Sequence, residues 1–106
     1  MSASCREYLR SGAAEEAQQA VDRLLAEEPT RAESLRLKAE SLLLKAVTVH
    51  SQVEFVTDAA VRAEVRDILR ELVAVRTEHP PFLQAVSFCK KNGYEDMRPL
   101  LQKRAA

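Results

Sequence analysis

Residues 30–56 read TRAESLRLKAESLLLKAVTVHSQVEFV, and apolar side chains recur along this stretch every three or four residues. That spacing places them on one face of a long amphipathic helix. Thr30 and Glu33 have the spacing of a capping box directly after Pro29, which predicts where the helix begins. The apolar seam of this helix consists of Leu35, Ala39, Leu42, Ala46, Val49, Val53 and Val56.

A second seam follows after a short connection and predicts another long helix. Thr57 or Asp58 is the expected N-cap. The stretch His79-Pro80-Pro81 is expected to stop the helix, because a proline disfavours helical backbone in the residue before it. Two long seams joined by a short connection predict an antiparallel helix pair. The second seam consists of Val61, Val65, Ile68, Leu72 and Val75.

The segment before Pro29 predicts two shorter helices. Ser4 and Glu7 form a second capping box, and the helix that they start is expected to run to about Ser11. Gly12 is then expected to end this first helix. The next helix should end near Pro29 and bury one face that carries Ala14, Ala17, Val21 and Leu24.

The segment after the double proline predicts a third hairpin. A fifth helix ends at residues 90–93, KKNG, where an Asn-Gly pair suits left-handed backbone. A sixth helix is expected from Asp96, because Pro99 then falls in its first turn. We therefore expect a single all-α domain over residues 1–106, with about six helices in three antiparallel hairpins. The inward side chains of the third hairpin are Phe82, Ala85, Val86, Cys89, Met97, Leu100 and Leu101.

Composition narrows the function class. Of the 106 residues 46% are hydrophobic and 30% charged, and 16 basic side chains balance 16 acidic ones. No overall field draws this chain to phosphate backbones or anionic lipid, which argues against nucleic acid and membranes as partners. No apolar run has the length of a membrane span, and the opening residues lack the charged-then-apolar pattern expected of a signal peptide. We expect a cytoplasmic protein, with the nucleus as the alternative location.

The sequence predicts no catalytic residue, cofactor or metal. His50 and His79 lack the spacing of metal ligands, and two glycines are too few for a phosphate-binding loop. Two basic features have ordinary explanations. Arg62, Arg66 and Arg70 alternate with acidic residues, which favours a salt-bridged exposed face over a phosphate track. The basic C-terminal third is a weak case for nucleic acid, since its aromatic residues are equally expected in the core.

The first hairpin resembles a tetratricopeptide repeat, a helix-turn-helix unit of about 34 residues. Ala39 and Leu42 continue the pattern, each 34 positions after Cys5 and Tyr8. The resemblance is clear for residues 5–42 and degenerates afterwards, where a second unit comes 51 instead of 34 positions later. A generic helical bundle remains the alternative. The matching residues of the first repeat are Tyr8, Gly12, Ala17, Val21, Leu24 and Pro29.

This resemblance implies an interaction scaffold whose concave groove holds a helix or extended peptide of another protein. The groove-facing positions would be Arg6 and Arg10 on the first helix and Arg36 and Glu40 on the third. Glu40 would repel a carboxylate, so the lysine- and asparagine-rich clamp for chaperone C-termini is not expected.

The third predicted helix is also apolar on a second side, which Leu37, Leu43, Leu44 and Val47 occupy. A helix with so wide an apolar arc is either central in the fold or covered by a partner. These four residues complete the candidate partner-binding set. We therefore predict a non-enzymatic adaptor or subunit. The alternative is a structural protein that self-associates into a homo-oligomer through its long seamed hairpin.

Overall fold

The computed structural model describes residues 2–28, 31–52 and 59–106, and six α-helices account for most of them. No strand occurs among these residues, so the predicted all-α class is confirmed. The helices are α1 (Ser2–Ser11), α2 (Ala14–Glu27), α3 (Ala32–His50), α4 (Ala59–Ala74), α5 (Pro80–Asn92) and α6 (Arg98–Ala105).

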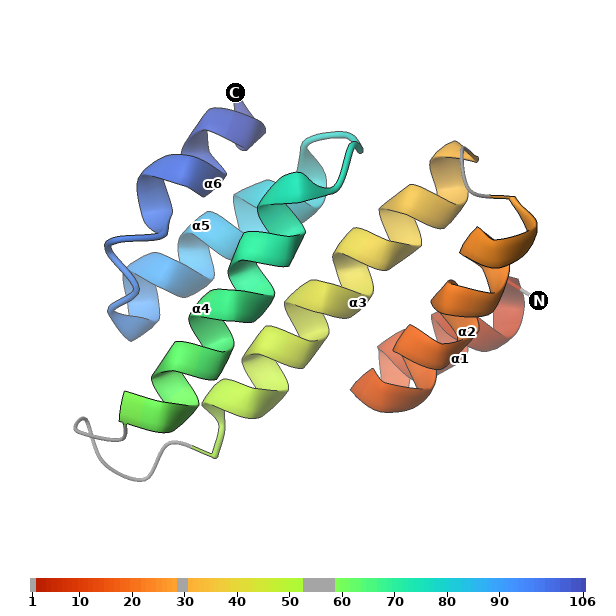
Figure 1. Cartoon of the computed structure of the whole chain (residues 1–106), viewed down its shortest axis with the longest axis horizontal. Helices are drawn as coiled ribbons and strands as arrows, with labels where there is room; N and C mark the ends of the chain where they lie inside the picture. Colours follow the sequence, from red (N-terminus) through yellow and green to blue (C-terminus); the bar gives the residue numbers. More distant parts are fainter. Residues whose placement is uncertain (1, 29–30, 53–58) are drawn as a thin grey trace.

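The helices follow one another as three hairpins, α1 with α2, α3 with α4, and α5 with α6 (Figure 1). The odd-numbered helices also contact each other, α1 with α3 and α3 with α5. Helix α3 thus contacts four other helices and lies at the centre of the molecule. The wide apolar arc predicted for this helix is largely explained by that central position.

The two predicted seams meet between α3 and α4, which make the most extensive helix pair. Leu42 and Leu72 are almost completely buried there, and Val49 is partly buried. Predicted seam residues Val53 and Val56 lie outside the described residues, as do the expected caps Thr30, Thr57 and Asp58. The other buried members of the two seams are Ala39, Ala46, Val65, Ile68 and Val75.

The interior consists of two apolar clusters joined by α3. The smaller cluster holds Cys5, Ala20, Val21 and Leu37. The larger one extends from α3 through α4 to the third hairpin and includes Phe82 and Tyr94, which are both fully buried. Leu37 belongs to the smaller cluster and Ala39 to the larger one. Helix α3 therefore packs against the first hairpin and against the rest of the chain.

Three predicted helix ends are wrong. Helix α1 already begins at Ser2, so Ser4 lies within the helix and does not start it. Helix α4 ends at Ala74, five residues before His79. Helix α6 begins at Arg98, two residues after Asp96, although Pro99 does lie in its first turn.

A distant arginine contacts the backbone directly after the early end of α4. The guanidinium of Arg104 in α6 donates a hydrogen bond to the carbonyl oxygen of Val75, and it lies over the Phe82 ring at 4.7 Å from the ring centre. The Val75 carbonyl also accepts from the N–H of Thr77, and the Val75 N–H donates to the carbonyl of Leu72, so the backbone here no longer follows the α-helical pattern. Val75 nevertheless remains buried, as its place in the seam predicts.

The end of α5 agrees with the sequence. Gly93 has the left-handed backbone expected after Asn92, with φ of 82°, and its N–H donates to the carbonyl of Cys89. None of the described helices combines the length and the apolar composition that a membrane span requires.

Candidate functional site

An apolar groove lies between α3 and α5, and we call it the α3–α5 groove. Its volume is about 350 Å³. Val47 leaves 43% of its surface exposed there, and Phe88 from α5 is partly buried. A hollow lined by exposed apolar side chains is one kind of surface at which proteins bind partners. The groove is lined by Val47, His50, Ser51, Ser87, Phe88, Lys91 and Asn92.

The apolar surface continues from Val47 along α3 to Leu44. Residues three apart on a helix are neighbours on its surface. Leu44 is partly buried, yet it packs in neither of the two core clusters. One further turn back, Glu40 pairs with Arg36 at 3.3 Å and ends the apolar strip. The exposed face of α3 therefore has an apolar C-terminal half and a charged N-terminal half.

A partly buried hydrogen bond fixes the wall of the groove. The Tyr94 hydroxyl and Nδ1 of His50 are hydrogen-bonded over 2.6 Å, which joins the end of α3 to the turn after α5. Tyr94 is fully buried, and its ring stacks on Phe88 with centres 5.6 Å apart. His50 meets Phe88 edge-on at 5.5 Å. These contacts hold Phe88 against the groove, because buried aromatic pairs prefer such defined geometries.

The His50–Tyr94 pair is uncharged at neutral pH. Burial lowers the pKa of His50 below its ordinary 6.5, and the Arg62 cation lowers it further, against a hydrogen bond to Asn92 that raises it. Burial raises the pKa of Tyr94, opposed by Arg62 and Arg66. Desolvation disfavours the charged form of each group. The groove therefore presents a neutral imidazole at its wall.

Two arginines of α4 also stabilise this wall of the groove. Arg62 donates to the carbonyls of Asn92 and Gly93, at 3.3 and 2.9 Å, and lies 4.3 Å from the centre of the Tyr94 ring. Arg66 pairs with Asp96 at 3.1 Å. Among the described residues, Arg70 pairs along its own helix, with Asp67 at 2.7 Å. Arg66 does form an ion pair, but its partner and the partners of Arg62 belong to the third hairpin, so these two arginines stabilise that hairpin instead of pairing along α4.

Comparison with known proteins identifies no relative. No protein-family model, curated protein or solved structure matches this chain.

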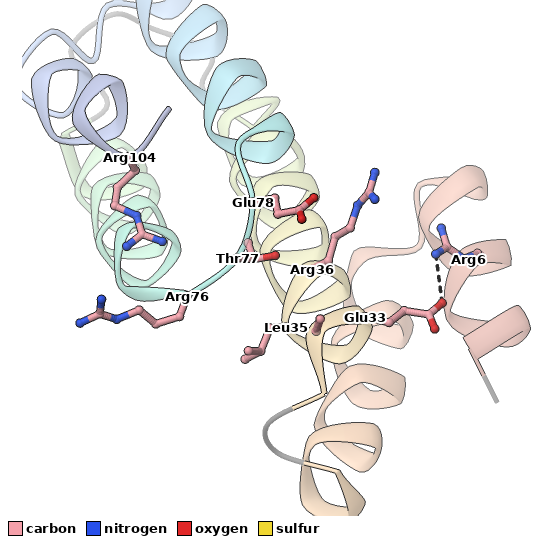
Figure 2. Close-up of a pocket in the computed structure, with 9 residues that line it drawn as sticks. Arg6, Glu33, Leu35, Arg36, Arg76, Thr77, Glu78 and Arg104 are labelled. Carbon is pink, nitrogen blue, oxygen red and sulfur yellow. Dashed lines mark hydrogen bonds and ion pairs between the residues drawn. The ribbon is translucent and has the colours of Figure 1, made fainter. Parts of the chain in front are cut away.

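A second hollow of about 620 Å³ lies beside the N-terminal end of α3, and we call it the arginine-rich hollow. Figure 2 shows its arginines extending in different directions, with Arg36 and Arg76 pointing apart. Arg6 pairs with Glu33 at 3.1 Å. These cations do not converge on one point, so the hollow lacks the geometry of an anion site. Its lining residues are Arg6, Ala32, Glu33, Leu35, Arg36, Arg76, Thr77, Glu78 and Arg104.

The predicted partner-binding residues separate into three groups. Leu37 and Leu43 are buried in the core, so the apolar arc at these two positions serves the fold and not a surface. Arg6, Arg36 and Glu40 lie in ion pairs at the charged end of α3, while Arg10 is exposed on the last turn of α1. Leu44 and Val47 form the apolar strip.

The reasoning from sequence missed His50, Tyr94 and Phe88 as parts of a site. His50 and Tyr94 are 44 positions apart, and no spacing rule joins them. One signal in the sequence did indicate this face of α3. Val47 is an apolar residue that does not belong to the predicted seam.

Potential reactive groups are few in the described ranges. No group of three or more His, Cys, Asp or Glu side chains there could hold a metal ion. Both cysteines are buried free thiols. Burial raises the pKa of Cys89 to about 11, helped by Asp96 and Glu95, so this thiol stays protonated at neutral pH.

Proposed function

We propose that this chain is a non-enzymatic protein-interaction module that holds a helix or an extended peptide of another protein in the α3–α5 groove. One observation carries the proposal: Val47 is 43% exposed beside Phe88 at a hollow of about 350 Å³. An apolar helix face next to a shallow groove is a common way to bind an amphipathic segment.

The order of the helices supports a tetratricopeptide-like array as the scaffold. Three hairpins follow in sequence, and each odd-numbered helix contacts the next. In solenoids of this kind each unit packs on its neighbour, and one set of helices lines the binding face. The α3–α5 groove lies between two odd-numbered helices, which is where the resemblance of the first hairpin places a ligand.

Self-association through the long hairpin is the weaker proposal. The described members of its two seams are mostly buried between α3 and α4 of the same chain. To mediate self-association, these seam residues would have to contact a second copy of the chain while they are packed between α3 and α4. A homo-oligomer would therefore use other apolar side chains, such as Leu83 and Leu100, which are 54% and 48% exposed.

The test compares two substitutions that place a carboxylate on the surface. Val47→Glu charges the groove, while Leu83→Glu does the same on the exposed surface of α5 outside the lining residues. Both positions are exposed, so each change is expected to alter the free energy of unfolding by less than about 1 kcal/mol. Circular dichroism and thermal unfolding check that both variants fold.

Tagged wild type, Val47→Glu and Leu83→Glu are then used as baits in the same lysate, with quantitative mass spectrometry of the captured proteins. We expect a protein captured by wild type and Leu83→Glu and lost with Val47→Glu. An identical set of captured proteins for all three baits would contradict the proposal.

A further inference from the structure

We infer that the segment held in the α3–α5 groove is acidic and amphipathic, with an apolar side chain on Val47 and Phe88 and a carboxylate on Lys91. This inference rests on the proposed function and adds the chemistry of the partner. Its basis is the distribution of charge around the groove.

The dimensions of the apolar surface limit the apolar part of the ligand. Leu44 and Val47 are one helical turn apart, which corresponds to a strip of about 5 Å along α3. Such a strip, with a hollow of about 350 Å³ at its end, accommodates one or two apolar side chains. Residues spaced three or four apart on a partner helix have the matching separation.

The charge carried by the described lining of the groove is positive. Among the described residues that line it, Lys91 is the one that carries a full charge at neutral pH, because His50 is held neutral. Lys91 is exposed on the last turn of α5. A ligand with a carboxylate beside its apolar side chain would therefore complement this groove, and a ligand with a cation there would be repelled.

The two described carboxylates that follow α5, those of Glu95 and Asp96, already form ion pairs. Glu95 pairs with Arg98 at 3.3 Å and Asp96 with Arg66 at 3.1 Å. Within the described ranges Lys91 forms no ion pair, and neither does its neighbour Lys90. Among the described residues, no ion pair neutralises the positive charge at this end of α5, and a carboxylate of a partner would complement that charge.

A peptide-selection experiment tests this inference without knowledge of the natural partner. A displayed library of random 12-residue peptides is selected separately against wild type, Val47→Glu, Lys91→Glu and Lys90→Glu. Lys90→Glu is the matched control, because it makes the same charge reversal at the adjacent position. The measured quantity is the ratio of Asp and Glu to Lys and Arg in the enriched peptides.

We expect wild type and Lys90→Glu to enrich peptides that combine apolar and acidic residues, and Val47→Glu to lose them. Lys91→Glu should shift the enriched charge towards Lys and Arg. For one selected acidic peptide, Lys91→Glu should weaken binding by at least about two- to fivefold at low salt, as expected for an exposed ion pair.

The other outcomes separate the two claims. If no enriched peptide depends on Val47, the proposed function itself fails. If peptides depend on Val47 but show no acidic preference, or if Lys90→Glu acts like Lys91→Glu, only the inference about charge is overturned. If sedimentation finds a dimer that Val47→Glu dissociates, a second copy of the chain occupies the groove, which overturns the inference.

Discussion

Replacing Tyr94 by Phe isolates the hydrogen bond that closes the wall of the groove. The change removes one hydroxyl and leaves the ring, which can still stack on Phe88 and lie beneath Arg62. The lost interaction is the 2.6 Å bond to Nδ1 of His50, at a tyrosine with no exposed surface. No large cavity forms, so the effect is that of the hydrogen bond.

The expected loss follows from the two partners. A typical buried hydrogen bond contributes about 1 kcal/mol, and a partner left unsatisfied adds a further cost. His50 lines the groove and is only partly buried, so water can replace part of the bond. We therefore expect Tyr94→Phe to reduce the free energy of unfolding by about 1.5 kcal/mol.

Urea unfolding followed by circular dichroism measures this change. With an m-value of about 1.5 kcal/mol/M, the midpoint should decrease by about 1 M while the slope stays the same. Tyr8→Phe is the matched control, because it removes the same group from a partly buried tyrosine in the N-terminal cluster. An unchanged midpoint for Tyr94→Phe, or an equal decrease for Tyr8→Phe, would refute the reasoning.

Three further predictions concern stability. The pKa of His50 is lower in the folded chain than its ordinary 6.5, so the unfolded chain takes up the proton first; the urea midpoint should decrease as the pH falls below about 6.5, and His50→Gln should flatten this decrease. Gly93→Ala places a side chain at φ of 82° and should cost about 1 kcal/mol in thermal unfolding, whereas an unchanged melting temperature would contradict the left-handed end of α5. Leu72→Ala, at a fully buried position, should cost about 2–5 kcal/mol in urea, while Leu83→Ala on the surface should cost far less.

Much of the fold can be predicted from sequence because the helices carry their own signals. The apolar spacing of α3 and α4 and the Asn-Gly pair after α5 are local features, and the structure agrees with them. Local features also predicted the wrong end of α4. The Arg104 side chain that meets the Val75 carbonyl comes from 29 residues further along the chain, and no pattern near Val75 indicates it.

The candidate site was harder to predict, because it depends on which apolar residues the fold leaves exposed. Leu43 and Leu44 are adjacent and chemically identical, yet one is buried in the core and the other lies outside it. Adjacent helical residues point about 100° apart, so the helices that pack around α3 decide which of them reaches the surface. That packing depends on contacts between segments far apart in the sequence, such as the bond between His50 and Tyr94.

The central claim is that the α3–α5 groove binds a segment of another protein, and the most direct test is chemical-shift mapping. The ¹⁵N-labelled chain is titrated with one peptide selected from the library, and the amide shifts are followed residue by residue. The claim predicts that the largest shifts fall on Leu44, Val47 and Ser51 of α3 and its end and on Phe88 and Lys91 of α5. Shifts centred on the arginine-rich hollow or on α2 would contradict it.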